Sequence, residues 1–320
     1  ARFALPSFFV TNSEACYKIL FDTFSFKKKY EYQEVPMVHT EPAYAKLNLT
    51  LDILGRRPDG YHDMRMVMQS IDLRDEVTVT FREEPGLEVS TDLSYLPRGE
   101  GNIAAKAAAR FFEATGSDPR GMSIDIQKHI PVCAGMAGGS SDGAAVLRIL
   151  GRTCAPELPR ERLEEIGELV GSDVPYCVRG GTVLAEGRGE RLTDLPGLPP
   201  CFLVACKPAC SISTPELFAL VRTKKLRCHP DTAGMTAALA AGDLEGVAHR
   251  LYNVFEDVLP RRYAQVFEMK SALLGLGAMA ASMTGSGPTV FGIFRDEERA
   301  RTAREVLAAQ YPAVFLCRTV

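Results

Sequence analysis

The sequence predicts an α+β protein built from two domains. Helix-like and strand-like segments follow one another in mixed order, a proline- and glycine-rich linker interrupts them at residues 195–200, and a glycine-rich loop joins a strand to a helix at residues 130–142. The chain has 320 residues, enough for two domains with cores of their own. We expect an N-terminal domain over residues 37–196 and a C-terminal domain over residues 197–320.

Composition and charge indicate a globular protein that does not bind nucleic acid. Hydrophobic residues make up 46% of the chain and charged residues 24%, and the net charge is −3. No apolar run reaches the length of a membrane span. The nine cysteines are scattered without a Cys-x-x-Cys pair, so we expect reduced thiols and a cytoplasmic location. Cys206, Cys210, Cys228 and His229 fit no zinc-binding spacing.

Residues 1–36 differ in character from the rest of the chain. An apolar start is followed by an aromatic and basic stretch with three consecutive lysines at residues 27–29. This order does not fit a signal peptide, in which the basic residues precede the apolar ones. We interpret residues 1–36 as an N-terminal extension of unknown role, and Met37 as a candidate natural start.

Residues 44–52 alternate between polar and apolar side chains, which predicts a strand. Lys46 and Asn48 share one face, and the intervening apolar residues face a core. The alternative is an ordinary edge strand with a solvated lysine. A turn at residues 55–60 then leads into Tyr61 and His62, which are either ligand contacts or surface residues.

Two strands, residues 67–73 and 76–82, are predicted next, joined by a turn at Arg74 and Asp75. Asn102 is a good N-cap for a helix that continues to about Thr115, and Gly116 is a typical stop signal.

The glycine-rich loop follows a predicted strand at residues 122–128 and precedes a predicted buried helix from Gly143, capped by Ser140 or Ser141. Glycines let a backbone approach a ligand, and the N–H groups at a helix N-terminus favour an anion such as phosphate. The loop matches neither the P-loop nor the dinucleotide pattern. The alternative is a turn that only packs the helix against a sheet.

Asp173 lies where a predicted helix over residues 161–170 ends, just before an apolar segment. A carboxylate in such a place can act as an acid or base, or it can be an ordinary turn residue. A strand and turn follow at residues 180–189.

The second domain is expected to begin with a buried strand at residues 201–206. A helix follows with Thr214 as its N-cap and Pro215 at its first position. Helical segments continue to about residue 275, with breaks near Gly242 and Leu259. The remaining elements are predicted as strands over residues 278–284 and 289–294, a helix over 297–310 and a strand over 313–317.

Three separated stretches, residues 45–49, 131–141 and 283–288, resemble the signature motifs of the GHMP kinases, a superfamily that includes galactokinase, homoserine kinase and mevalonate kinase. Residues 55–62, 171–175 and 184–189 narrow the resemblance to members that phosphorylate 4-diphosphocytidyl-2-C-methyl-D-erythritol. The resemblance extends over about residues 44–317. It implies two α+β domains with the active site in the cleft between them. It also implies transfer of the ATP γ-phosphoryl group to the 2-hydroxyl of that substrate, in the non-mevalonate isoprenoid pathway.

The resemblance also implies roles for individual residues. Lys46 and Asp173 match the catalytic pair, and Asn48, Tyr61, His62 and Thr214 match positions around the cytidine-bearing substrate. Ser141 is the expected ligand of a Mg²⁺ ion that accompanies ATP. The positions that match the ATP-phosphate loop are Pro131, Val132, Cys133, Ala134, Gly135, Met136, Ala137, Gly138, Gly139, Ser140 and Ser141.

These residue types suit phosphoryl transfer, which depends on positioning and charge stabilisation. Asp173 is expected to accept the hydroxyl proton or orient the hydroxyl, and Lys46 to pair with Asp173 and stabilise charge near the transferred group. The Tyr61 ring is expected to stack on cytosine while His62 hydrogen-bonds its polar edge. The loop departs from the family where Cys133 and Ala137 replace glycine. Both are small, so we expect the loop to close.

Two other functions remain open from the sequence. The first is another GHMP kinase, acting on homoserine, a sugar or a mevalonate. The second is a nucleotide-binding protein without catalysis on the same fold. We expect the protein to be a monomer or a homodimer.

Overall fold

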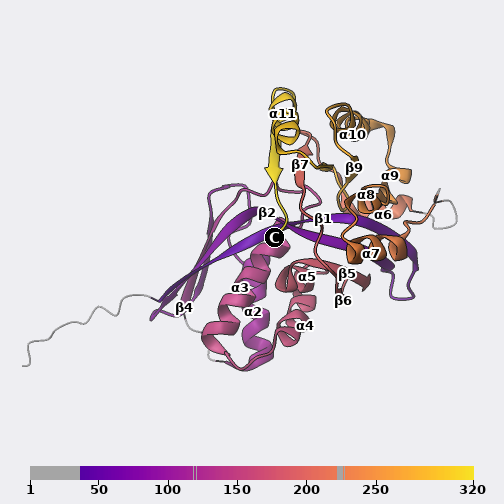
Figure 1. The fold of residues 1–320 in the computed structure, drawn as a ribbon. Coiled ribbons are helices and arrows are strands. Elements are labelled where there is room, and N and C mark those ends of the chain that lie inside the picture. The colour runs from indigo at the N-terminus through magenta and orange to yellow at the C-terminus, as the bar shows by residue number, and fades with distance from the viewer. Residues whose placement is uncertain (1–36, 118, 120, 222–225, 227) are drawn as a thin grey trace, which may run out of the picture. The chain divides into compact units, whose positions relative to one another are not determined.

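The computed structural model describes residues 37–117, 119, 121–221, 226 and 228–320. The N-terminal extension expected over residues 1–36 therefore lies outside the described residues. The described part of the chain mixes helices and strands, as predicted (Figure 1).

The described strands form a seven-stranded and a four-stranded sheet. The larger sheet has the order β3-β4-β2-β1-β8, and β5 pairs with β2 and β6 with β5. Its two long central strands form an antiparallel hairpin. Its strands are β1 (Val38–Arg56), β2 (His62–Arg82), β3 (Leu87–Thr91), β4 (Gly121–Gln127), β5 (Thr182–Gly187), β6 (Arg191–Asp194) and β8 (Tyr252–Asn253).

The predicted turn at Arg74 and Asp75 is wrong, because β2 passes through both residues without a break. Arg74 pairs with Tyr44 and Asp75 with Ala43 in the β1–β2 ladder. Asp75 is fully buried, and its carboxylate accepts hydrogen bonds from the backbone N–H groups of His129 and Ile130. These hydrogen bonds allow the carboxylate to be buried within the sheet. The donors lie more than 50 residues away along the chain, so the sequence around Asp75 does not reveal them.

Helices α2 (Ile103–Thr115), α3 (Gly138–Cys154) and α4 (Arg160–Val170) lie together against the larger sheet (Figure 1). The predicted ends of α2 are confirmed. The Asn102 side chain accepts a hydrogen bond from the Ala104 N–H at 2.9 Å, and Gly116 adopts the left-handed conformation with φ 66°. The short helix α5 (Val174–Arg179) follows α4 directly, and the sequence did not predict it.

The smaller sheet has the order β11-β7-β10-β9. Its strands are β7 (Phe202–Lys207), β9 (Ala280–Met283), β10 (Val290–Phe294) and β11 (Ala313–Cys317), close to the predicted ranges. The helices of this part are α6 (Thr214–Leu220), α7 (Thr232–Ala241), α8 (Leu244–Ala248), α9 (Phe255–Val258), α10 (Gln265–Gly275) and α11 (Glu297–Ala308), with the 3₁₀ turn η2 (Arg261–Tyr263).

The predicted cap of α6 is wrong by one residue, because Ser213 occupies the N-cap and Thr214 is the first helical residue. Pro215 then falls within the first turn, where its missing N–H leaves no intrahelical bond unmade. The Thr214 hydroxyl is thereby free for a different partner.

The two sheets share a core. One cluster of buried side chains joins Leu51 and Met68 of the larger sheet to Val204 and Met283 of the smaller one. The linker at residues 195–200 connects β6 of the larger sheet to β7 of the smaller. Because this linker leads from one sheet to the other, we propose a domain boundary near residue 196. The strand β8 comes from the second half of the chain and pairs with β1 of the larger sheet.

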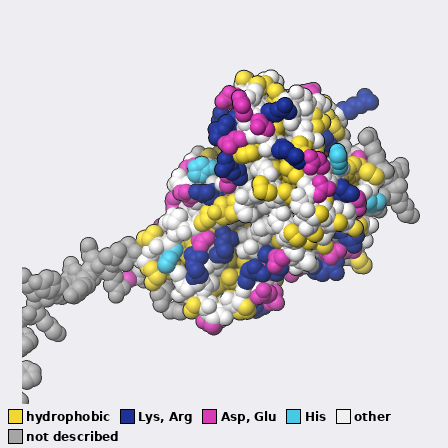
Figure 2. All heavy atoms as spheres, viewed as in Figure 1, with side chains coloured by type: hydrophobic (Ala, Val, Ile, Leu, Met, Phe, Trp, Pro, Cys, Tyr) yellow, Lys and Arg dark blue, Asp and Glu magenta, His cyan; other side chains and the backbone are white. Residues whose placement is uncertain are grey.

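The viewed surface carries lysine and arginine side chains interspersed with aspartate and glutamate (Figure 2). This mixture agrees with the small net charge of −3. Among the described residues, no helix is both long and apolar enough to cross a membrane.

Candidate active site

Two adjoining cavities lie where the three motifs meet. The first, of about 410 Å³, is lined by Lys46, Asp173, Arg188, Thr214 and Phe218 together with the turn at residues 285–287. The second, of about 480 Å³, is lined by most of the glycine-rich loop and the start of α2. Both cavities are lined by Cys133, Gly135, Ala137 and Thr214, so a ligand in one cavity borders the other.

Lys46 lies on β1 and is only 3% exposed, which rules out the solvated edge-strand alternative. Its ammonium donates a hydrogen bond to Asn48 Oδ1 at 2.6 Å. We expected Lys46 to pair with Asp173. In the described part of the chain, the Lys46 ammonium bonds to Asn48 and not to Asp173, so this expectation is wrong. Lys46 and Asn48 are two residues apart on one strand, so their side chains are neighbours. Asp173, at the N-cap of α5, lines the same cavity, so a group bound there can contact both side chains.

Asp173 occupies the N-cap position of α5, but its side chain makes no capping hydrogen bond. The backbone carbonyl of Asp173 instead accepts from the Cys177 N–H at 3.0 Å. The carboxylate is half-buried and lines the first cavity. It is therefore available to accept a hydrogen bond from a bound hydroxyl.

The glycine-rich loop closes without glycine at two positions, as expected, because Cys133 and Ala137 adopt left-handed conformations with φ 53° and 60°. Such a conformation costs about 1–2 kcal/mol for a residue with a Cβ atom. The loop then turns directly into α3 at Gly138. The N-terminal N–H groups of this 17-residue helix border the second cavity, which suits an anion.

The prediction that Ser140 or Ser141 caps α3 is wrong, because the N-cap is Ala137 and both serines lie inside the helix. Ser140 lines the second cavity. Ser141 is buried, lines neither cavity, and donates its hydroxyl hydrogen to the Tyr44 carbonyl at 2.5 Å. Ser141 therefore ties α3 to β1, and its position does not suit the metal ligand that we expected.

The third motif fastens β1 to the glycine-rich loop. Asn48 Oδ1 accepts from the Gly285 N–H at 2.9 Å, and the Asn48 N–H donates to Thr284 Oγ1 at 3.0 Å. The Thr284 hydroxyl donates to the Gly135 carbonyl at 3.2 Å. Asn48 is fully buried and lines neither cavity, so it orients Lys46 and the turn. The motif at residues 283–288 was recognised in the sequence, but the structural roles of Thr284 and Gly285 were missed.

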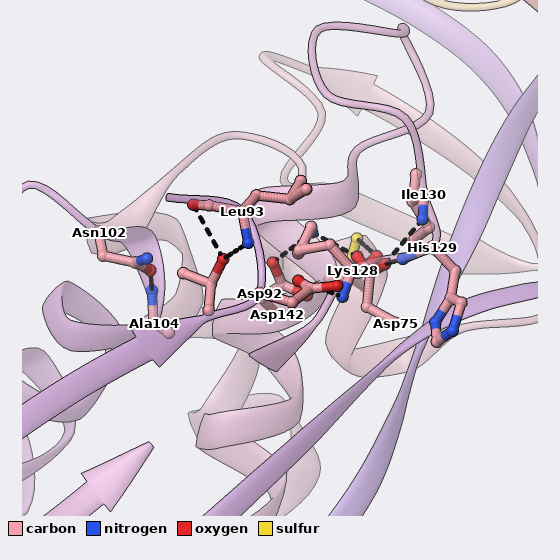
Figure 3. A network of polar contacts seen from close by, with 12 residues as sticks. Asp75, Asp92, Leu93, Asn102, Ala104, Lys128, His129, Ile130 and Asp142 are labelled. Carbon is pink, nitrogen blue, oxygen red and sulfur yellow. Dashed lines mark hydrogen bonds and ion pairs between the residues drawn. The ribbon is translucent and has the colours of Figure 1, made fainter. Parts of the chain in front are cut away.

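A buried ion cluster, drawn in Figure 3, contributes Lys128 and Asp142 to the lining of the second cavity. The ammonium of Lys128 pairs with the carboxylates of both Asp75 and Asp142. Its backbone N–H donates to Asp92 at 3.1 Å. The cluster thus connects β2, the segment before the loop and the first turns of α3, and it fixes both ends of the loop. No local sequence pattern indicated this cluster, because Asp75, Lys128 and Asp142 lie far apart along the chain.

The pKa of Asp142 is raised to about 7. Burial of the carboxylate is the main cause, the Lys128 ammonium opposes the rise, and the Asp75 carboxylate adds to it. The ordinary value is 3.8, so the folded state binds this proton more tightly than the unfolded chain. The stability that this proton contributes is complete below about pH 3.8 and is lost as the pH rises through about 7.

Asp142→Asn should remove this pH dependence, because the amide oxygen can still accept from Lys128 but carries no charge. Relative to the variant, the native protein should lose thermal stability between about pH 4 and 7, as measured by Tm. Asp125→Asn, a partly exposed carboxylate outside both cavities, is the control and should follow the native protein. Parallel Tm curves for the native protein and Asp142→Asn would contradict the assignment.

Of the four residues expected around the cytidine-bearing substrate, Thr214 lines the first cavity, and Tyr61 and His62 contact side chains that line it. Asn48 lines neither cavity, so its expected contact with the substrate is wrong. Tyr61 is 54% exposed, and the Arg188 guanidinium lies 4.1 Å from the centre of its ring. The His62 ring stacks on Phe218 with 5.0 Å between centroids. Burial, and then the charge of Arg56, lower the pKa of His62, so its ring favours the neutral form. Thr214 lines the cavity, and its hydroxyl is 2.7 Å from that of Ser286.

Comparisons with known proteins agree with this arrangement. Residues 102–181 match the N-terminal domain of the GHMP kinases, and residues 235–313 match their C-terminal domain. A 4-diphosphocytidyl-2-C-methyl-D-erythritol kinase of Alkaliphilus metalliredigens is 42% identical over 275 residues, which cover 86% of this chain and 94% of that protein. The enzyme of the same name from Clostridium botulinum (strain Kyoto) is 39% identical over 278 residues, covering 87% and 99%.

Solved structures show the same relationship. The crystal structure of a 4-(cytidine 5'-diphospho)-2C-methyl-D-erythritol kinase matches with a TM-score of 0.75 and 31% identity, over 88% of this chain and 99% of that one. A homoserine kinase from Cytophaga hutchinsonii matches with a TM-score of 0.69 and 17% identity, over 89% and 96%, which shows a common fold alone. The chain belongs to the 4-diphosphocytidyl-2-C-methyl-D-erythritol kinase family of the GHMP kinases.

Proposed function

We propose that the protein transfers the γ-phosphoryl group of ATP to the 2-hydroxyl of 4-diphosphocytidyl-2-C-methyl-D-erythritol, a step in the non-mevalonate route to isoprenoid precursors. One observation carries the proposal: Lys46 and Asp173 line a cavity that directly adjoins the cavity of the glycine-rich loop. A phosphate donor in the loop cavity and an alcohol in the first cavity would therefore meet between these two charged groups.

ATP would occupy the second cavity, with its phosphates against the loop and the N-terminus of α3. Backbone N–H groups and the helix dipole favour negative charge there. Mg²⁺ would accompany ATP and neutralise its phosphates, as Mg²⁺ usually does with one or two protein ligands at most. Among the two serines of the loop, Ser140 lines this cavity and Ser141 does not, so Ser140 is better placed to approach such an ion.

Asp173 would accept a hydrogen bond from the 2-hydroxyl and orient it toward the γ-phosphorus. It would accept the hydroxyl proton as the new P–O bond forms and the bond from the γ-phosphorus to the bridging oxygen breaks, with ADP as the leaving group. Lys46, held by Asn48, would stabilise the negative charge on the transferred group. The absence of a direct Lys46–Asp173 bond in the described chain supports this division of roles, because each group then keeps bonding capacity for the substrates.

The cytidine end of the acceptor would lie near Tyr61, His62 and Phe218. These rings project beside the first cavity, and Phe218 lines it. Stacking of a base on an aromatic side chain is worth about 1–3 kcal/mol. The flat face of Tyr61 and the neutral edge of His62 suit an uncharged pyrimidine.

Tyr61→Ala should raise the KM for the acceptor by roughly 5- to 100-fold, the loss of about 1–3 kcal/mol of stacking. His62→Ala should act in the same direction, and the KM for ATP should stay within about 3-fold in both. Steady-state kinetics with each substrate varied in turn provide the measurement. Tyr95→Ala is the control, since Tyr95 is 70% exposed and lines neither cavity, and it lacks the contact that Tyr61 makes with Arg188 of the first cavity. An unchanged acceptor KM would remove Tyr61 and His62 from the site.

The proposed function is tested by an acceptor panel of the cytidine-linked substrate, homoserine, mevalonate and a sugar, with ATP, Mg²⁺ and ADP release as the readout. Only the first acceptor should give turnover. ATP binding without ADP release for any acceptor would favour the non-catalytic alternative, and turnover of another acceptor would favour another GHMP kinase.

We also propose a cytoplasmic location, in a monomer or homodimer that binds no nucleic acid. The eight cysteines within the described residues are all free thiols, which supports a reducing compartment.

A further inference from the structure

The turn that closes the first cavity depends on a side chain that lines neither cavity. Asn253 belongs to the two-residue strand β8, which pairs in parallel with β1 beside Thr50 and Leu51. Asn253 is 1% exposed. Its amide nitrogen donates to the carbonyl of Met283 at 2.8 Å and to that of Gly285 at 2.9 Å. Its oxygen accepts from the Phe255 N–H at 3.0 Å.

These three bonds use both amide hydrogens and the amide oxygen in one orientation. The two carbonyls belong to the end of β9 and to the first residue of the turn at residues 285–287, which lines the cavity with Lys46 and Asp173. Asn253 therefore fixes the point at which the turn leaves the sheet. A carboxylate in its place would face two carbonyl oxygens with no hydrogen to donate.

The bonds continue to the expected catalytic lysine. The Gly285 N–H donates to Asn48 Oδ1, and the same oxygen accepts from the Lys46 ammonium. The separation between Asn48 and Gly285 is 237 residues along the chain, so no local structure holds them together. The position of the ammonium thus depends on Asn48, that of Asn48 on Gly285, and that of Gly285 on Asn253.

We propose that Asn253 is a positioning residue for phosphoryl transfer, which holds the 285–287 turn so that Asn48 presents the Lys46 ammonium to the transferred group. The proposal rests on the proposed function, because it assigns Lys46 to the reaction. Displacement of a catalytic group by about 1 Å can reduce turnover by about 10²-fold. Asn253 lines neither cavity, so its effect should fall on kcat.

Asn253→Ser is the test, with Ser282→Ala as the matched control. Ser282 is equally buried and its hydroxyl also reaches the Met283 carbonyl, at 3.4 Å, but it has no bond to Gly285. Asn253→Ser should lower kcat at least about 10-fold, within the range for a misplaced group, with both KM values within 3-fold. Ser282→Ala should keep kcat within 3-fold. A loss of kcat of the same size in both variants would indicate a structural role only and overturn the proposal.

A double-mutant cycle provides the readout that a structural role would not move. If Asn253 acts through Asn48, then Asn253→Ser should lower kcat by less than 3-fold when it is added to Asn48→Ala. Multiplicative losses would overturn the proposal, because independent sites have additive free energies. If the native protein phosphorylates no acceptor at all, the proposed function fails instead, which separates the two failures.

A measurement on the native protein covers the case in which Asn253→Ser does not fold. The Gly285 amide should exchange its hydrogen as slowly as the buried amides of β9, because the turn is fixed on both sides. Exchange of Gly285 as fast as that of exposed turns would show that the turn is not held, and would contradict the proposal.

Discussion

Asp173→Asn should reduce kcat by about 10²- to 10⁴-fold, the usual contribution of a positioned general base. The amide keeps the size of the carboxylate but does not take up a proton. Because the Asp173 side chain makes no capping hydrogen bond, Tm should change little. ADP release with saturating substrates gives kcat, and thermal unfolding gives Tm. Asp125→Asn is the control for the charge change.

Lys46→Met should act on the same step, with a loss of about 10²- to 10³-fold, as when one group that stabilises transition-state charge is removed. Methionine retains much of the buried stem. Lys207→Met is the control. Within the described part of the chain, the Lys207 ammonium bonds only to the backbone carbonyls of Pro208 and Cys210, and Lys207 lines neither cavity. Near-normal turnover in either Asp173→Asn or Lys46→Met would contradict the assigned roles.

Gly135→Ala should be the most damaging change in the glycine-rich loop. Gly135 has φ 72°, and an added Cβ atom would lie 2.2 Å from the Thr284 carbonyl oxygen. Backbone stands on both sides of this contact, so no flexible side chain can move aside. We expect the loop and the third motif to separate, with a KM for ATP raised at least about 100-fold, equivalent to roughly 2.7 kcal/mol.

Gly116→Ala separates the effect of the clash from that of the dihedral angle. Gly116 has nearly the same φ, 66°, but an added Cβ atom would meet no atom within 4 Å. This control should cost about 1–2 kcal/mol of stability, the price of a left-handed alanine, and leave ATP kinetics unchanged. Similar ATP kinetics in Gly135→Ala and Gly116→Ala would show that the contact with Thr284 is unimportant. Urea unfolding and steady-state kinetics measure both quantities.

Elements with local causes were predictable from the sequence. Helix α2 begins after Asn102 and ends at Gly116, because capping chemistry depends on residues within one turn. The alternating pattern around Lys46 gave the strand and its shared face with Asn48, and the two side chains do bond. The motifs also predicted which segments meet, although they lie far apart in the chain.

Features that depend on distant partners were not predictable in the same way. Asp75 looks like a turn residue until the N–H groups of His129 and Ile130 supply its partners. The helix cap was misplaced because Ala137 adopts a left-handed conformation that its side chain does not favour. Such strain is held by surrounding structure, and this loop lies at the candidate site.

The identity of the phosphorylated oxygen tests the central claim most directly. The native protein should be incubated with ATP, Mg²⁺ and 4-diphosphocytidyl-2-C-methyl-D-erythritol, and the product examined by ³¹P NMR with ¹³C at carbon 2 of the methylerythritol. A new phosphomonoester signal coupled to that carbon, with one ADP released per product, is the predicted result. ADP release without that product, or a phosphate on another hydroxyl, would contradict the account.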